Sequence, residues 1–168
     1  MQDNQLHKIL IVGGGAGGLE LATKLGNSLG KKKKAEITLI DAKKTHIWKP
    51  LLHEIAAGSI NPHKDELDYL AQGFWHGFKF RLGRMDNLDR EKKEVSLEPY
   101  LDNQGKEIIA RRTFKYDTLV MSIGSTVNDF SVNGAAEFSI ALDNQNQAEL
   151  FHNRLHNAIV KAQTQNSK

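Results

Sequence analysis

Glycines crowd one short stretch of the chain, Gly13 to Gly18, which has the pattern GxGxxG, and an acid, Asp41, follows it. Between a strand and a helix, such glycines allow a tight turn and bring phosphate oxygens close to backbone N–H groups. We expect Gly13 to make the turn, Gly15 to admit a pyrophosphate, and Gly18 to let the next helix lie close to the sheet. Asp41 would accept hydrogen bonds from ribose hydroxyls and repel a 2′-phosphate. These residues predict an adenine-dinucleotide site, with a ligand-free glycine turn as the alternative.

The elements around the glycines fit that interpretation. Residues 8–12 form a short apolar, β-branched run that ends at the glycines, which indicates a buried parallel strand. Apolar residues recur at helical spacing from residue 16 to about residue 29, and residues 36–41 predict a second strand. A strand, a glycine turn, a helix and a strand make a βαβ unit with parallel strands. Asp41 would then end the second strand, where the dinucleotide pattern places its ribose-binding acid.

The rest of the chain departs from a plain NAD-binding domain. After loop and short helix over residues 42–70, three β-like stretches predict an inserted β-meander. They lie at about residues 79–88, 93–98 and 107–116. Residues 117–123 predict another buried strand, stopped by Gly124. A plain NAD domain would continue with alternating helices and strands, so the meander favours FAD. The predicted fold class is α/β, a Rossmann-like domain with a parallel sheet and a β-meander insertion.

Three blocks of sequence carry a resemblance to a known family. GGGAGGLE is followed by THIWKPLLHEIAAGS (residues 45–59) and YDTLVMSIGSTVNDF (residues 116–130). In this order the blocks resemble the bacterial type II NADH dehydrogenases, and the middle block is the most specific. The resemblance implies the two-dinucleotide-binding-domain flavoprotein fold. It also implies that FAD is bound, that NADH supplies hydride, and that a membrane quinone receives the electrons.

The resemblance also implies roles for individual residues. The FAD pyrophosphate would be held by the glycine stretch, that is by Gly13, Gly14, Gly15, Ala16, Gly17 and Gly18. Asp41 and Ala42 would hold the adenosine ribose, and the backbone of Met85 would meet the adenine. His46 would lie against the cofactor. The residues near the isoalloxazine ring would be Lys49, Pro50 and Leu51. Gly124 belongs to a second glycine motif near the FAD, in which Ser122 replaces the commoner alanine. No catalytic residue is assigned.

Several residue types are informative through their absence or their small number. The sequence contains no cysteine, which excludes a disulfide scaffold, a thiolate zinc site and a redox cysteine pair. Without that pair, electrons would pass from the flavin directly to a dissociable acceptor, and a quinone is an acceptor of this kind. His46, His53, His63 and His76 show no zinc-ligand pattern, so no metal site is expected. The net charge is only +3, and Lys31–Lys34 predicts a solvated turn, so no nucleic-acid partner is expected.

The predicted organisation is one incomplete domain followed by a helix. Residues 1–143 would form part of an FAD-binding domain, and residues 144–168 a connecting helix toward a missing NADH-binding domain. Only one dinucleotide pattern is present, since Gly134 is the single glycine after Gly124. We therefore expect no NADH turnover by the chain alone. The helix over residues 147–163 carries an apolar stripe that predicts self-association.

Localisation and two alternative functions complete the expectations. There is no signal peptide and no apolar run of about 18 residues, which favours a soluble, cytoplasmic chain. Full-length members of the resembled family would lie at the cytoplasmic face of the inner membrane. The alternatives are an adenine-dinucleotide-binding module without catalysis and an NAD-dependent dehydrogenase. No His–acid or Tyr–Lys catalytic pattern supports the dehydrogenase.

Overall fold

The protein is described from a computed structural model, which places residues 5–61 and 66–165. His63 lies outside these described residues. Contacts between residues divide the chain into two compact units. The first unit comprises residues 1–46 and 67–124, and the second comprises residues 47–66 and 125–168. The expected boundary after residue 143 stays a prediction.

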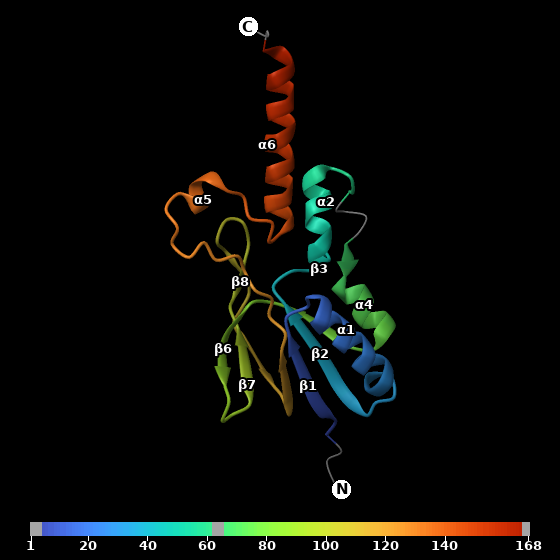
Figure 1. The fold of residues 1–168 in the computed structure, drawn as a ribbon. Coiled ribbons are helices and arrows are strands. Elements are labelled where there is room, and N and C mark those ends of the chain that lie inside the picture. The colour runs from blue at the N-terminus through green and yellow to red at the C-terminus, as the bar shows by residue number, and fades with distance from the viewer. Residues whose placement is uncertain (1–4, 62–65, 166–168) are drawn as a thin grey trace. The chain divides into compact units, whose positions relative to one another are not determined.

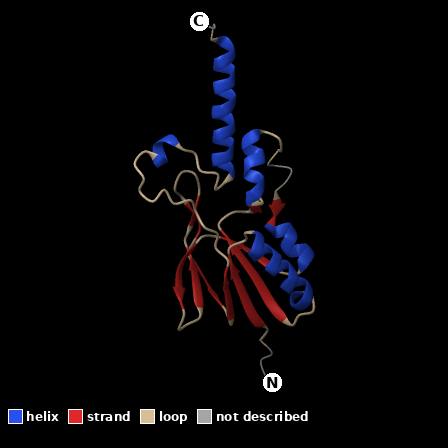
Figure 2. Cartoon of the chain, viewed as in Figure 1, coloured by secondary structure: helices blue, strands red, loops and turns tan. Residues whose placement is uncertain are grey.

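A four-stranded parallel sheet forms the centre of the first unit (Figures 1 and 2). Its order is β11-β1-β2-β5, and β1 pairs in parallel with both β2 and β11. The strands are β1 (His7–Val12), β2 (Ala35–Asp41), β5 (Lys79–Leu82) and β11 (Thr118–Met121). Apolar residues on both faces of β1 and β2 are buried, as a sheet covered on both sides requires. The predicted βαβ unit is confirmed. A strand is also present near residues 117–123, but it is the edge strand of the sheet and its residues are exposed or half-buried, so the expectation of a buried strand is wrong.

Two helices cover one face of this sheet. Helix α1 (Ala16–Leu25) continues into a π-helical turn, Gly26–Gly30, and α4 (Tyr69–His76) lies beside it. Their apolar sides meet the sheet in one core cluster, which includes Ile11, Leu19, Ala22, Leu39 and Tyr69. Helix α4 lies almost wholly beyond the stretch of residues 42–70 that the sequence predicts as loop and short helix. Its end signals are present, because Asp68 caps the Ala71 N–H and Gly77 ends the helix with a φ of 75°.

The other face of the sheet is covered by a three-stranded antiparallel sheet. This is the predicted meander, formed by β6 (Met85–Asp89), β7 (Glu94–Leu97) and β10 (Arg112–Lys115). Val95 and Leu97 are fully buried against apolar residues of β1 and β2.

Two of the predicted strands are wrong in extent. The stretch 79–88 is two strands, because Gly83 breaks it with a φ of 158°, so that β5 joins the parallel sheet and β6 the meander. The stretch 107–116 is also divided. Its first part, β9 (Glu107–Ile109), pairs with β8 (Tyr100–Leu101) before β10 begins. A further short pair joins β3 (Thr45–His46) to β4 (Leu67–Asp68).

The second unit is built around two helices, α2 (Leu52–Ala57) and α6 (Gln145–Thr164). Leu52, Ile55 and Ala56 pack against Ala148 at the start of α6. The predicted helix over residues 147–163 is therefore confirmed, and Figure 1 shows its C-terminal half extending past α2. A short helical turn, Lys49–Leu51, precedes α2, and α5 (Ala135–Phe138) lies in the loop before α6.

Candidate dinucleotide-binding site

The glycine turn links the end of β1 to the start of α1. Gly13 has a φ of 101° and its N–H donates to the Ile40 carbonyl at 2.8 Å, which ties the turn to β2. A Cβ on Gly13 would collide with the Ser122 backbone, and one on Gly18 would collide with the Gly13 carbonyl and the Ser122 Oγ. Both positions therefore require glycine so that the turn, α1 and the end of β11 can approach closely.

The remaining side of the turn is open. A Cβ built on Gly15 or Gly17 would meet nothing within 4 Å. Gly15 is the N-cap residue of α1, and no side chain caps this helix end. The N–H groups of the first helical turn have no acceptors within the helix, and the helix dipole makes this end positive. Free N–H groups beside open space are the arrangement that binds phosphate groups at helix N-termini.

Asp41 lies at the carboxyl end of β2, beside the turn. Its Oδ2 accepts a hydrogen bond from the Gly14 N–H at 2.7 Å, and its Oδ1 accepts one from the Lys43 N–H at 2.8 Å. These two backbone donors orient the carboxylate.

A cavity of about 180 Å³ opens at this edge of the sheet. It is lined by four of the predicted site residues, Gly13, Asp41, Ala42 and Met85. The cavity lies where parallel α/β sheets bind their ligands, at the carboxyl ends of the strands. Sequence reasoning missed other lining residues, among them Gly83, Arg84 and Ile123. The available signal is Gly83, which directly follows β5 (Lys79–Leu82), whereas the alternation in the sequence predicts one strand over residues 79–88.

Tyr69 lies beneath the glycine turn and was also missed. Its side chain is 2% exposed, its hydroxyl donates to the Gly14 carbonyl at 2.6 Å, and its ring stacks on Phe80 with centroids 4.9 Å apart. Burial raises the pKa of the Tyr69 phenol far above its usual range, and the charge of Asp41 adds to this. The hydroxyl is therefore a protonated donor at all physiological pH values.

His46 lies on β3, with its ring centroid 6.3 Å from that of Tyr69. Burial lowers the pKa of His46, Asp41 opposes the shift, and Lys43 adds to it. The neutral form of the imidazole is therefore favoured. The expected contact between His46 and a cofactor stays a prediction.

The remaining predicted residues are divided between the two units. Lys49, Pro50 and Leu51 belong to the second unit, where the Lys49 Nζ donates to the Ser125 carbonyl at 2.9 Å and lies 3.4 Å from an Asp143 oxygen. Gly124 belongs to the first unit. Nearby, the Ser122 hydroxyl donates to the Gly13 carbonyl at 2.6 Å. The serine that replaces the commoner alanine thus binds the glycine turn.

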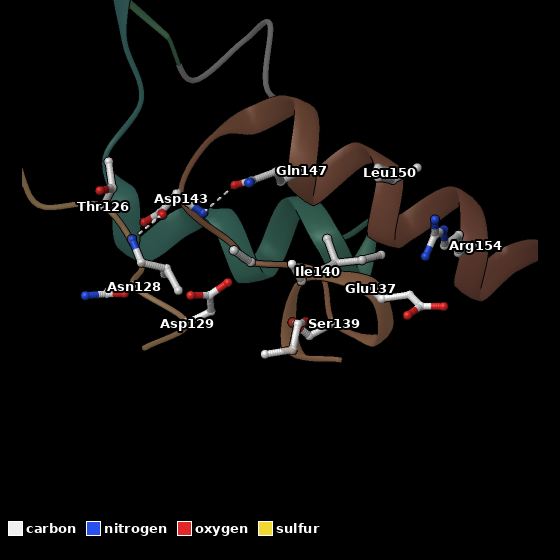
Figure 3. Close-up of a pocket in the computed structure, with 14 residues that line it drawn as sticks. Thr126, Asn128, Asp129, Glu137, Ser139, Ile140, Asp143, Gln147, Leu150 and Arg154 are labelled. Atoms are coloured by element: carbon white, nitrogen blue, oxygen red, sulfur yellow. Dashed lines mark hydrogen bonds between the residues drawn. The ribbon is translucent and has the colours of Figure 1, made fainter. Parts of the chain in front are cut away.

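A second cavity, of about 800 Å³, lies within the second unit (Figure 3). It is lined by the loop over residues 126–143 and by Gln147, Leu150 and Arg154 of α6. Asp143 holds the loop, since its Oδ2 accepts the Val127 N–H at 2.6 Å and its own N–H donates to Gln147 at 2.9 Å. None of the predicted cofactor-binding residues lines this cavity. The candidate site is therefore the glycine turn with the smaller cavity.

The described residues form neither a metal site nor a membrane-spanning helix. No group of three or more His, Asp or Glu residues within 5–61 and 66–165 is arranged to hold a metal ion. In the same part of the chain, no helix combines the length and the apolar character needed to cross a bilayer.

Comparison with known proteins decides the family. Residues 7–161, nearly the whole chain, match the pyridine nucleotide-disulphide oxidoreductase family. The chain belongs to this family. Its membership accounts for the Rossmann-like fold, the glycine turn and the meander together, and it confirms the predicted fold class.

Individual relatives of this chain carry the name of one kind of enzyme within the family. The chain is 46% identical to the type II NADH:quinone oxidoreductase of Haemophilus influenzae over 156 residues, which are 93% of this chain and 35% of the relative. It is 30% identical to the enzyme of that name from Staphylococcus aureus over 139 residues, which are 82% of this chain and 31% of the relative. The expected resemblance to type II NADH dehydrogenases is confirmed. The chain spans about a third of the length of these relatives.

Solved structures share the fold at low sequence identity. NDH2 from Plasmodium falciparum in complex with NADH superposes with a TM-score of 0.74 at 18% identity, covering 98% of this chain and 32% of the other. The sulfide:quinone oxidoreductase from Aquifex aeolicus gives a TM-score of 0.71 at 19% identity, covering 92% and 32%. At these identities the likeness shows the fold alone.

Proposed function

We propose that the glycine turn binds the adenine-dinucleotide half of FAD, and that the chain is the FAD-binding portion of an NADH:quinone oxidoreductase. The observation that carries the proposal is the uncapped start of α1, where Gly15 and Gly17 leave open space beside free N–H groups. Asp41 and a cavity lined by Ala42 and Met85 adjoin this turn, which suits a ribose and an adenine.

Each part of the site has a defined task in this proposal. The N–H groups at the start of α1 hold the pyrophosphate, Asp41 accepts the ribose hydroxyls, and the backbone of Met85 borders the adenine. Lys49, Pro50 and Gly124 serve the flavin end. FAD, when bound, accepts hydride from NADH and releases electrons to a quinone. Because the chain has no cysteine, it offers no disulfide relay between flavin and acceptor.

The whole-protein activity is part of the same proposal. Relatives named as NADH:quinone oxidoreductases support NADH and quinone as partners. For the whole protein the proposal includes a location at the cytoplasmic face of the inner membrane, as the resemblance to type II NADH dehydrogenases implies. We further propose that these 168 residues alone do not turn over NADH, because the sequence contains a single GxGxxG pattern.

Ligand binding tests the proposal most directly. Purified protein should show a flavin spectrum or bind added FAD and ADP, and Gly15→Val should abolish this binding while leaving the circular dichroism spectrum native. The valine side chain would fill the space left for the pyrophosphate. Lys24→Val places the same side chain at an exposed position of the same helix and should bind normally. Parent-like affinity in Gly15→Val would show that the site is wrongly assigned.

Anaerobic addition of NADH to the flavin-loaded protein tests the second part. We expect no saturable reduction of the flavin. Saturable NADH turnover would contradict inactivity of the chain alone, and binding of NAD without FAD would favour the dehydrogenase alternative.

A further inference from the structure

Both backbone polar groups of Gly14 are held by side chains from outside the glycine turn. The N–H donates to Asp41 Oδ2 at 2.7 Å, and the carbonyl accepts the Tyr69 hydroxyl at 2.6 Å. These two residues lie far apart in the sequence, at the end of β2 and the start of α4. The peptide groups on either side of Gly14 therefore have fixed orientations.

We propose that Tyr69 is a positioning residue for the pyrophosphate site, and that its hydroxyl, acting through the Gly14 carbonyl, aims the Gly15 N–H at the ligand. The inference rests on the proposed dinucleotide function. It adds a residue from outside the GxGxxG pattern.

The geometry of the peptide group carries the argument. The Gly14 carbonyl and the Gly15 N–H belong to one planar peptide unit, and no described peptide bond is cis. In a trans peptide the C=O and N–H point in opposite directions. Because the carbonyl is drawn toward buried Tyr69, the Gly15 N–H must point away from the core. A Cβ position on Gly15 also has no neighbouring atoms within 4 Å, so this residue borders open space.

Tyr69 is itself firmly placed. Its ring is 2% exposed and stacked on Phe80, its N–H donates to the Lys44 carbonyl at 3.2 Å, and the Asp68 cap fixes the first turn of α4. A Cβ on Gly14 would lie 2.5 Å from the Tyr69 hydroxyl oxygen, so the glycine and the tyrosine fit each other.

Burial alone does not explain a tyrosine at this position. A phenylalanine would fill the same space and stack on Phe80 equally well, and it would have no hydroxyl to satisfy. The hydroxyl has one recorded partner, the carbonyl of the turn. The hydroxyl therefore serves to orient the Gly14–Gly15 peptide.

The test compares ADP with adenosine, which lacks the phosphates. Titrations of the ¹⁵N-labelled 168-residue chain followed by NMR give both affinities and the Gly15 amide shift. Tyr69→Phe should weaken ADP binding about tenfold, the scale expected when a buried carbonyl loses its partner. It should leave adenosine affinity unchanged and reduce the ADP-induced shift of the Gly15 amide. Tyr116→Phe is the matched control and should behave as the parent, because the half-buried Tyr116 hydroxyl has no hydrogen bond to any residue within 5–61 and 66–165.

The outcomes separate this inference from the proposed function. Parent-like ADP affinity in Tyr69→Phe, or an equal loss for ADP and adenosine, would overturn the positioning role while leaving the site assignment intact. Failure of the parent to bind ADP would overturn the proposed function instead. If Tyr69→Phe does not fold, the parent decides the question. Its Gly15 amide must shift when ADP binds, and an unmoved resonance would overturn the inference.

Discussion

Asp41 has two tasks that can be separated by choosing the ligand. In the structure its carboxylate accepts the Gly14 and Lys43 N–H groups, so each oxygen already has one backbone donor. A carboxylate oxygen has capacity for a further hydrogen bond, which leaves room for ribose hydroxyls. The same side chain can thus shape the turn and recognise the sugar.

Asp41→Ala should weaken ADP binding by about 1–3 kcal/mol, because hydroxyls and the Gly14 N–H lose their acceptor. Calorimetry with ADP and with 2′,3′-dideoxy-ADP isolates the ribose contribution. The parent should prefer ADP, and Asp41→Ala should bind the two ligands alike. If the variant still discriminates between them, Asp41 does not contact the ribose.

Individual site residues could be predicted from the sequence only where they belong to a local sequence pattern. Gly13, Asp41, Ala42 and Met85 were predicted and do line one cavity. Tyr69 and Arg84 were not predicted, because their positions depend on a helix and a strand break that only long-range packing determines. No sequence pattern around Tyr69 indicates that its hydroxyl binds the glycine turn.

At the scale of elements, the close packing of α1 on the sheet depends on Gly18. Gly18→Ala should lower the free energy of unfolding by about 1–3 kcal/mol, since the methyl group would overlap the Gly13 carbonyl and the Ser122 hydroxyl. Urea unfolding without ligand measures this. Gly17→Ala is the matched control, because its methyl group meets nothing. It should be neutral or slightly stabilising, and equal effects of both variants would contradict the packing argument.

The loop before α6 should respond to pH through Asp143. The Val127 N–H holds the pKa of this carboxyl below its usual value, and Lys49 adds to the shift. The charged form is therefore favoured in the folded state. The contribution of the charged Asp143 to the stability of the folded state is fully present above the ordinary aspartate pKa. It is lost as the pH falls through the lowered pKa of the folded state.

NMR of the Val127 amide should follow that titration. Asp143→Asn should remove it, while Glu137→Gln, which deletes an equal charge in the same segment, should leave it in place. A Val127 resonance that titrates identically in parent and Asp143→Asn would show that Asp143 does not hold this loop.

Elements were predicted well where a periodic pattern is long and poorly where glycine interrupts it. The βαβ unit and the helix over residues 147–163 have uninterrupted apolar periodicity, and both are confirmed. Gly83 does not disturb the β-like alternation of residues 79–88 in the sequence, but its backbone conformation ends the strand. Helix α4 spans only two turns, too few to stand out from its surroundings, although Asp68 and Gly77 mark its ends.

At the scale of the whole molecule, the two units differ in how completely they bury their apolar residues. The first unit has apolar clusters on both faces of its sheet. In the second, the described cluster reaches α6 only at Ala148. Beyond that point Phe151, Leu155 and Ile159 remain 40%, 43% and 50% exposed along one side of the helix. Adjacent exposed apolar side chains of this kind mark association surfaces.

We therefore expect the chain to self-associate through α6. Its weight-average mass in light scattering should rise with concentration, because pairing would remove the three side chains from water at about 25 cal/mol per Å². Leu155→Glu combined with Ile159→Glu should hold the protein monomeric, since burying a carboxylate is costly. Phe138→Glu, at an 82% exposed residue of α5, is the control and should associate as the parent does. A parent that stays monomeric at every concentration would contradict the prediction, and association that survives the double substitution would place the interface elsewhere.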